Sequence, residues 1–165
     1  MADINAEIVN CKKCRLWQNA KNAVPGEGPP DAKVMLIGQN PGAKEDEVGR
    51  PFVGRSGKFL NKMLSAHGIK REEVFITSIV KHVTPQNRVP LEDEIGACIP
   101  YLSKQICLIS PKIVLLMGKV ASKTPRGGDV VYLRTVHPSA AMRFTKMRER
   151  FEEDLKSLKE LMQQS

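Results

Sequence analysis

Short continuous runs of apolar residues alternate along the chain with longer segments of helical periodicity. The runs fall at about Lys33–Ile37, Val74–Val80, Lys112–Met117 and Val130–Val136. Runs of this length are typical of strands that are buried on both faces, as in a parallel sheet. The pattern predicts four strands. The third is expected to be central because it is apolar after its first residue.

Three segments have the period of an amphipathic helix: Ser56–His67, Leu91–Ile109 and Lys146–Met162. The second contains Pro100, where a kink or a break is expected. Before the first strand, residues 1–32 form a lead-in for which we expect a helical turn, a cysteine pair and a proline- and glycine-rich loop. Strands separated by helices predict one α/β domain over residues 1–165, with a mainly parallel four-stranded sheet between two helical layers.

Composition adds a few limits. No apolar run approaches membrane-spanning length, and the N-terminus lacks the pattern of a secretory signal, so we expect a cytoplasmic protein without a membrane partner. Lysine and arginine total 26 against 18 acidic residues, which gives a net charge of +8. This surplus suits a polyanionic partner such as nucleic acid, although basic proteins are common and charge alone decides little.

Polar side chains are concentrated in the loops that follow predicted strands. These loops are Gly38–Phe52, Lys81–Arg88 and His137–Ser139. In a parallel sheet such loops meet at one edge, so Asn40 and His137 are expected to face one crevice. The first loop offers amides, carboxylates and one aromatic ring, which are the groups needed to hold a planar polar ligand and to activate water. It lacks the spacing of a Walker motif or a dinucleotide site.

The chain has four cysteines: Cys11, Cys14, Cys98 and Cys107. The spacing of Cys11 and Cys14 indicates a metal site or a redox pair. A thioredoxin-like pair would follow a strand and begin a helix, whereas this pair precedes the first strand, and its position therefore favours metal. Cys107 is expected to be a core cysteine.

Several ordered motifs together resemble the family 4 uracil-DNA glycosylases, which carry an iron–sulfur cluster. They are GxxPGxxED (38–46), RPFVG (50–54), the helix RSGKFLNKML (55–64) and HPSAAMR (137–143). VPGEG (24–28), QNRVPLEDEI (86–95) and CIPYL (98–102) extend the likeness over almost the whole chain. The resemblance implies a monomeric DNA repair enzyme with a uracil-DNA glycosylase-like fold. Such an enzyme flips a deaminated base, above all uracil, out of DNA and hydrolyses its N-glycosidic bond with a positioned water.

The resemblance also assigns roles by position. Phe52 would stack on the base, and His137, as a neutral imidazole, would donate to the base carbonyl. Gln39 and Ser78 are further candidates for base contacts. The candidates for DNA contacts are Gly42, Arg55, Ser56, Ser139, Met142 (as a wedge) and Arg143. Without the resemblance, the ordinary interpretation of Phe52 is a core aromatic, and of Arg55 and Arg143 solvated surface charges.

Two departures from the family pattern concern the reaction. The usual GEAPG is GQNPG here, and Asn40 resembles the asparagine with which the GxNPG branches of the superfamily orient water. We expect Asn40 to position the water, with Glu45 as the second candidate. Ser78 stands where the family usually has an asparagine that reads the base edge, which leaves a shift toward hypoxanthine or xanthine open.

A third departure concerns the metal ligands. Cys11, Cys14 and Cys98 match three ligands of the family's cluster, whereas the fourth is His82, as in the UdgX-like branch. The resemblance implies a 4Fe–4S cluster, and zinc is the alternative for the same ligand set. Segment Thr84–Pro90 lacks the inserted histidine loop of that branch, so covalent capture of the sugar is not expected. A non-catalytic iron–sulfur nucleic-acid binder and a redox or metal sensor remain as alternative functions.

Overall fold

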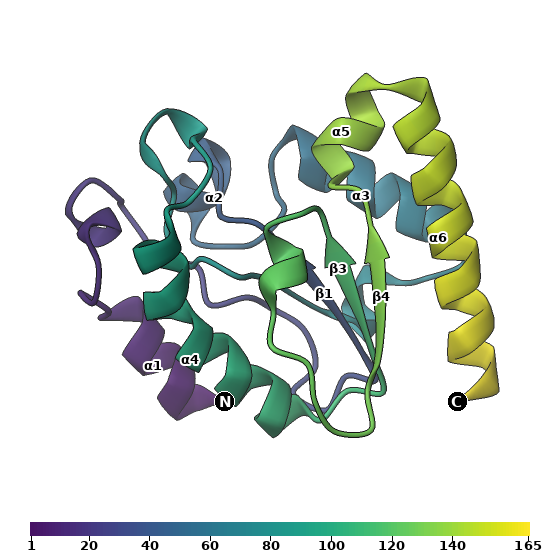
Figure 1. Ribbon diagram of the computed structural model, residues 1–165, viewed down its shortest axis with the longest axis horizontal. Coiled ribbons are helices and arrows are strands. Elements are labelled where there is room, and N and C mark those ends of the chain that lie inside the picture. Colours follow the sequence, from purple (N-terminus) through teal and green to yellow (C-terminus); the bar gives the residue numbers. More distant parts are fainter.

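The computed structural model describes residues 1–165 and contains a sheet of four parallel strands between two layers of helices (Figure 1). The strands are β1 (Val34–Gly38), β2 (Phe75–Ser78), β3 (Ile113–Met117) and β4 (Val131–Thr135), in the spatial order β2-β1-β3-β4. Every strand pair is parallel, which confirms the predicted fold class, and β3 is an interior strand as expected. An isolated antiparallel bridge joins Glu27 to Ile76.

Alternate residues of the strands contribute to two apolar cores, one on each face of the sheet. Val34 and Leu36 face a core that also contains side chains of α3 (Arg55–Ala66), α5 (Pro138–Arg143) and α6 (Thr145–Gln164). The opposite face of the sheet packs on α4 (Glu92–Ile109), and α1 (Ala2–Val9) packs outside α4. In Figure 1, α3, α5 and α6 accordingly lie on one side of the strands, with α1 and α4 on the other.

Two short helices occupy segments that the sequence pattern treated as loops. Helix α2 (Ala43–Val48) begins directly after the turn at Pro41 and Gly42, and α5 begins at His137 and Pro138. Both are about six residues long and too short to show helical periodicity, so their apolar pattern could not reveal them. Single 3-10 turns occur at Arg15–Gln18, Arg71–Glu73, Pro85–Asn87 and Ala121–Lys123.

The structure corrects two expectations for α4. Of the kink or break expected at Pro100, the break is absent: the helix is continuous over Glu92–Ile109, and the buried side chains of Cys98 and Leu102 on either side pack it against the sheet. Cys107 is exposed and is not a core residue. It lies two positions from the buried Gln105 and Ile109, and two positions turn a side chain to the opposite face of a helix.

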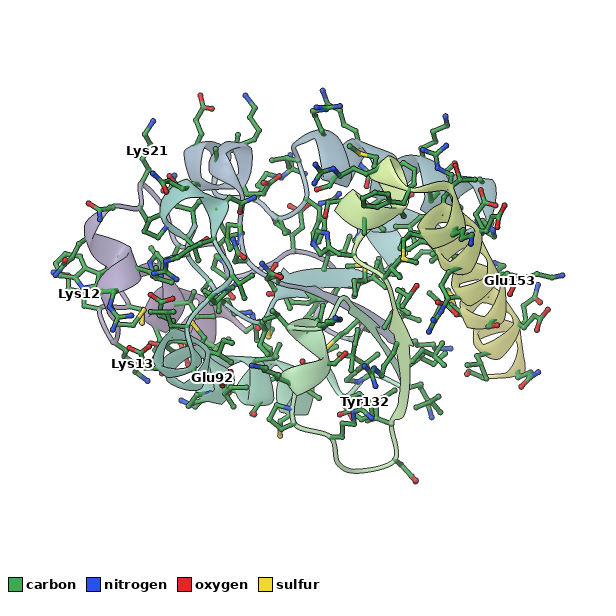
Figure 2. All side chains as sticks on the ribbon, turned by 45° about the horizontal axis from the view of Figure 1, so that its top comes forward. Lys12, Lys13, Lys21, Glu92, Tyr132 and Glu153 are labelled. Atoms are coloured by element: carbon green, nitrogen blue, oxygen red, sulfur yellow. The ribbon has the colours of Figure 1, made fainter.

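Charged side chains project from both ends of the molecule. Lys12, Lys13 and Lys21 project from the lead-in at one end of the molecule, whereas Glu153 projects from α6 at the opposite end (Figure 2). None of the helices combines the length and the apolarity that crossing a membrane would require.

Candidate active site

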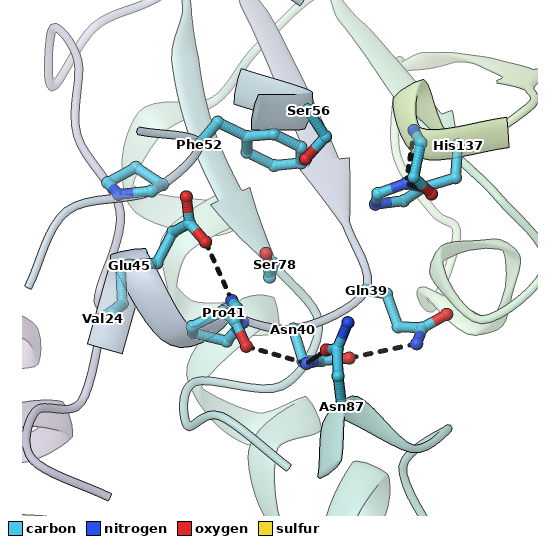
Figure 3. Close-up of a pocket in the computed structure, with 13 residues that line it drawn as sticks. Val24, Gln39, Asn40, Pro41, Glu45, Phe52, Ser56, Ser78, Asn87 and His137 are labelled. Carbon is cyan, nitrogen blue, oxygen red and sulfur yellow. Dashed lines mark hydrogen bonds between the residues drawn. The ribbon is translucent and has the colours of Figure 1, made fainter. Parts of the chain in front are cut away.

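A hollow of about 200 Å³ opens beyond the carboxyl ends of the strands. Its walls come from the loop after β1, the end of β2, the loop after β2 and the start of α5, as the parallel topology predicts (Figure 3). Asn40 and His137, which are 97 positions apart in the sequence, therefore line the same hollow. The lining residues are Val24, Gln39, Asn40, Pro41, Gly42, Glu45, Pro51, Phe52, Ser56, Ser78, Asn87, His137 and Ser139.

The ring of Phe52 forms one wall of the hollow. Its backbone has a φ of 49°, in the left-handed region that residues other than glycine rarely adopt. The ring crosses the end of β1 so closely that a Cβ at Gly38 would lie 2.6 Å from its Cζ. The Phe52 and His137 rings have centroids 6.0 Å apart and planes tilted by 31°. The two rings therefore border the same hollow as neighbours.

His137 is held as a neutral hydrogen-bond donor. Its Nδ1 accepts from the backbone N–H of Ser139 at 3.1 Å and lies 2.7 Å from the Ser139 hydroxyl. A backbone N–H can only donate, so Nδ1 carries no proton and the neutral ring bears its proton on Nε2. Burial lowers the pKa of His137 to about 4. The ring can consequently donate from Nε2 throughout the neutral pH range.

A chain of amides fixes Asn40 on the opposite side of the hollow (Figure 3). The Oδ1 of Asn40 accepts from Nε2 of Gln39 at 3.0 Å. Its Nδ2 donates to the carbonyl oxygen of Pro41 at 2.8 Å and to Oδ1 of Asn87 at 3.3 Å. Because an amide oxygen has two lone pairs, Oδ1 of Asn40 can accept one further hydrogen bond, for example from water.

Glu45 ties two loops of the site together. Its Oε1 accepts from the backbone N–H of Gly42 at 3.0 Å, and its Oε2 accepts from Val53 and Gly54 at 2.8 and 2.6 Å. The carboxylate thus joins the turn at Pro41 and Gly42 to the loop that carries Phe52. An ionised carboxylate has about four acceptor positions, so Glu45 keeps capacity for a water as well.

The remaining candidates for base and DNA contacts divide into two groups. Ser78 is buried at the end of β2, Ser56 lies in the first turn of α3, and both line the hollow. The other three lie outside it, with Arg55 exposed at the start of α3 and with Met142 and Arg143 at the end of α5. None of those three contributes to the walls of the hollow.

The four candidate metal ligands gather at another corner of the molecule. Cys11 and His82 line one hollow between the lead-in and the loop after β2, while Cys14 and Cys98 belong to the same apolar core. Burial above all raises the pKa of the Cys98 thiol to about 11, against the opposing effect of Lys81. Burial also lowers the pKa of His82, which keeps its imidazole neutral. No three histidine, cysteine or acidic side chains converge on one point as they do around a single metal ion.

The model of the Uracil DNA glycosylase superfamily matches residues 25–160. The chain belongs to this superfamily. The type-4 uracil-DNA glycosylase of Sulfurisphaera tokodaii is 42% identical over 96% of this chain and 83% of its own length. The enzyme of the same name from Pyrobaculum aerophilum is 39% identical over 90% of this chain and 87% of its own length. That from Archaeoglobus fulgidus is 34% identical over 96% of this chain and 92% of its own length.

Four residues that line the hollow of this superfamily member were not predicted from the sequence as site residues: Val24, Pro41, Pro51 and Asn87. Asn87 had a detectable signal, because it is a polar side chain in a loop that follows a strand. Val24 had none, because its place at the hollow depends on a hydrogen bond from its N–H to the carbonyl oxygen of Lys81, a residue far away in the sequence.

Proposed function

We propose that this chain is a DNA repair glycosylase that hydrolyses the N-glycosidic bond of a deaminated base, above all uracil, in DNA. One observation carries the proposal: in a member of the uracil DNA glycosylase superfamily, an aromatic ring, a neutral imidazole donor and an oriented amide line one small hollow. The names of the relatives at 34–42% identity agree with this activity.

The base would be held by Phe52 and His137. A target inside a duplex must leave the stack before it can enter a hollow of this size, which implies base flipping. Phe52 then offers an aromatic face for stacking, and Nε2–H of His137 donates to a carbonyl oxygen of the base. As the glycosidic bond breaks, negative charge develops on the leaving base, and a fixed donor stabilises that charge more strongly than it stabilises the neutral substrate.

The water would be positioned by Asn40. An amide is too weakly basic to remove a proton early, but a bond that breaks with strong cationic character on the sugar needs only a well-placed water. Oδ1 of Asn40 has a free lone pair for that water, and Gln39 and Asn87 hold the amide in place. Glu45 is the second candidate, since its carboxylate lines the same hollow. We further propose that the GxNPG motif places this chain apart from type-4 enzymes with GEAPG.

Recognition of the base would rest on Ser78 and Gln39 at the hollow, and recognition of DNA on residues around it. A single hydroxyl at Ser78 reads a base edge less strictly than a carboxamide, so hypoxanthine and xanthine stay candidate substrates. The net charge of +8 supports attraction to phosphates. The proposed DNA contacts are Gly42, Arg55, Ser56, Ser139, Met142 and Arg143.

We also propose that Cys11, Cys14, His82 and Cys98 would hold a 4Fe–4S cluster. Three thiols and a neutral imidazole at one corner are suitable donors for such a cluster, and the similarity to type-4 enzymes favours it over zinc, the alternative for the same ligands. When bound, the cluster would cross-link the lead-in, the loop after β2 and α4, with a potential raised by the imidazole.

The cluster proposal is tested by iron and sulfide analysis of anaerobically purified protein, together with its visible absorbance. We expect iron and sulfide in equal amounts. His82→Ala should lower the iron content, His82→Cys should restore it, and Cys107→Ala serves as the matched control without effect. Zinc in place of iron, or an unchanged iron content in His82→Ala, would overturn the ligand assignment.

The activity is tested with single- and double-stranded oligonucleotides that carry uracil, hypoxanthine or xanthine, followed by alkaline cleavage. We expect release of uracil, and loss of release in Asn40→Ala and His137→Ala. Tight binding of these oligonucleotides without cleavage would overturn the enzymatic function and favour the nucleic-acid binder.

We propose that the active form is a cytoplasmic monomer with a single domain.

A further inference from the structure

The backbone of Phe52 needs an explanation that the reaction does not supply. A positive φ at a bulky residue persists only where the surroundings hold the backbone in that conformation. Helix α3 supplies one constraint, since a Cβ at Gly57 would lie 2.0 Å from the carbonyl oxygen of Phe52. This close approach limits where the carbonyl can lie, but it provides no hydrogen bond.

Arg71 supplies the hydrogen bonds. It lies in the 3-10 turn before β2, and its side chain is only 19% exposed. Its Nη1 donates to the carbonyl oxygen of Phe52 at 2.8 Å and to Oδ1 of Asn61 at 2.7 Å. Its Nη2 donates to the carbonyl oxygen of Pro51 at 2.5 Å. One guanidinium therefore holds two successive carbonyl oxygens of the segment that carries the stacking ring.

The guanidinium is itself anchored to the sheet. Nη2 of Arg71 also donates to Oε1 of Glu27 at 3.1 Å. The backbone of Glu27 exchanges two hydrogen bonds with Ile76 of β2, at 3.0 and 2.8 Å. The same carboxylate accepts from Nε and Nη2 of Arg50 at 2.8 and 3.0 Å. A planar fork of fixed donors can span these acceptors, whereas the single nitrogen of a lysine cannot.

We propose that Arg71 is a positioning residue that sets the plane of the Phe52 ring and thereby the affinity of the hollow for a flipped base. The inference rests on the proposed function for the role of the ring. Arg71 does not line the hollow, so it acts through the backbone of Pro51 and Phe52 and not by touching the base.

The test compares Arg71→Met with the matched control Arg50→Met. Each variant removes one of the two guanidinium partners of the Glu27 carboxylate, but only Arg71→Met also removes the hydrogen bond to the Phe52 carbonyl. Inhibition by free uracil reports on the stacking site, and the affinity for undamaged DNA reports on the rest of the surface. We expect Arg71→Met to weaken the binding of free uracil about tenfold, as for a misplaced contact group. Its affinity for undamaged DNA should stay within about twofold of that of the wild type. Arg71→Lys should recover only part of the loss. Equal losses in Arg71→Met and Arg50→Met would overturn the proposal.

A double-mutant cycle with Phe52→Ala separates positioning from a general loss of stability. If Arg71 acts through the ring, Arg71→Met should change uracil affinity less than about twofold in the Phe52→Ala background. Independent, multiplying losses would contradict the proposal.

Hydrogen exchange of residues 50–54 gives a readout that requires no activity. In Arg71→Met this segment should exchange faster while β1 is unchanged, because the amides of Val53 and Gly54 follow the released carbonyls. If the wild-type protein releases no base, the proposed function is overturned. Faster exchange of residues 50–54 in Arg71→Met would even then support the positioning of Phe52 by Arg71. Unchanged exchange would overturn the positioning.

Discussion

The backbone N–H of Ser139 lies 3.1 Å from Nδ1 of His137 and donates to it. This contact is also the N-terminal cap of α5, so the geometry of a short helix determines which ring nitrogen carries the proton. Pro138 at the first helical position has no N–H, which leaves Ser139 as the first available backbone donor. The tautomer needed at the hollow thus follows from the order His-Pro-Ser once that segment becomes helical.

The low pKa of His137 predicts a wide range of activity toward acid. Its pKa is about 4, so the donor should stay neutral and the rate should not fall on account of His137 until the pH approaches that value. The same shift affects stability: above pH 6.5, the ordinary pKa of histidine, the ring is neutral in both the folded and the unfolded chain, and the fold has its full stability. The contribution of His137 is lost as the pH falls from 6.5 toward 4, because the unfolded chain binds the proton first.

Single-turnover rates at a series of pH values check this prediction, with denaturation midpoints recorded in parallel. His137→Ala should be slower by about 100-fold or more, as for loss of an oxyanion donor. Ser139→Ala keeps the backbone N–H and should lose less than about tenfold. A rate that falls with a midpoint near pH 6.5 would contradict the neutral donor.

Asn40→Ala should slow base release by about 100-fold, because the water loses its acceptor. Asn87→Ala keeps that acceptor and removes only one of the two hydrogen bonds from Nδ2 of Asn40, so a loss of about tenfold or less is expected. Single-turnover cleavage at saturating enzyme measures both, and binding of uracil-containing DNA should be nearly unchanged. A larger effect of Asn87→Ala than of Asn40→Ala would show that Asn40 is not the water ligand.

Glu45→Gln should destabilise the protein by about 2 kcal/mol, because at least one of three backbone N–H groups then faces an amide donor. Glu47→Gln, two positions further along the same helix and exposed, should change the free energy of unfolding by about 0.5 kcal/mol or less. Chemical denaturation measures both variants. Equal stabilities would mean that Glu45 does not hold the two loops together.

The buried carboxylate of Glu94 predicts a second acid-sensitive contribution to stability. The side chain is fully buried, and hydrogen bonds from Arg88 above all hold its pKa at about 2. A lowered pKa stabilises the fold above the ordinary value of 4.5, and that stability disappears as the pH falls from 4.5 toward 2.

Glu94→Gln leaves Arg88 without its ionic partner and should cost about 3 kcal/mol at neutral pH. The exposed Glu92 pairs only with Lys123, so Glu92→Gln should cost less than about 1 kcal/mol. Urea denaturation at pH 7 and at pH 3.5 compares the two variants with the wild type. The gap between Glu94→Gln and the wild type should narrow at the lower pH, and a constant gap would contradict the assignment.

The sequence determined the parts of this protein that depend on periodicity and local order. Four apolar runs and three amphipathic segments were enough to predict the parallel sheet, its interior strand β3 and the main helices. Because parallel strands bring their carboxyl ends to one edge, the sequence also predicted that Asn40 and His137 would line one hollow.

Only the tertiary structure decided how the side chains of the site are held. The bonds from Arg71 to the Phe52 carbonyl and from Glu45 to Val53 and Gly54 cross between elements, and no residue spacing encodes them. The continuity of α4 through Pro100 and the exposure of Cys107 depend on which face packs against the sheet. Local preferences amount to a fraction of the energy that packing supplies, so the packed arrangement prevails wherever the two conflict.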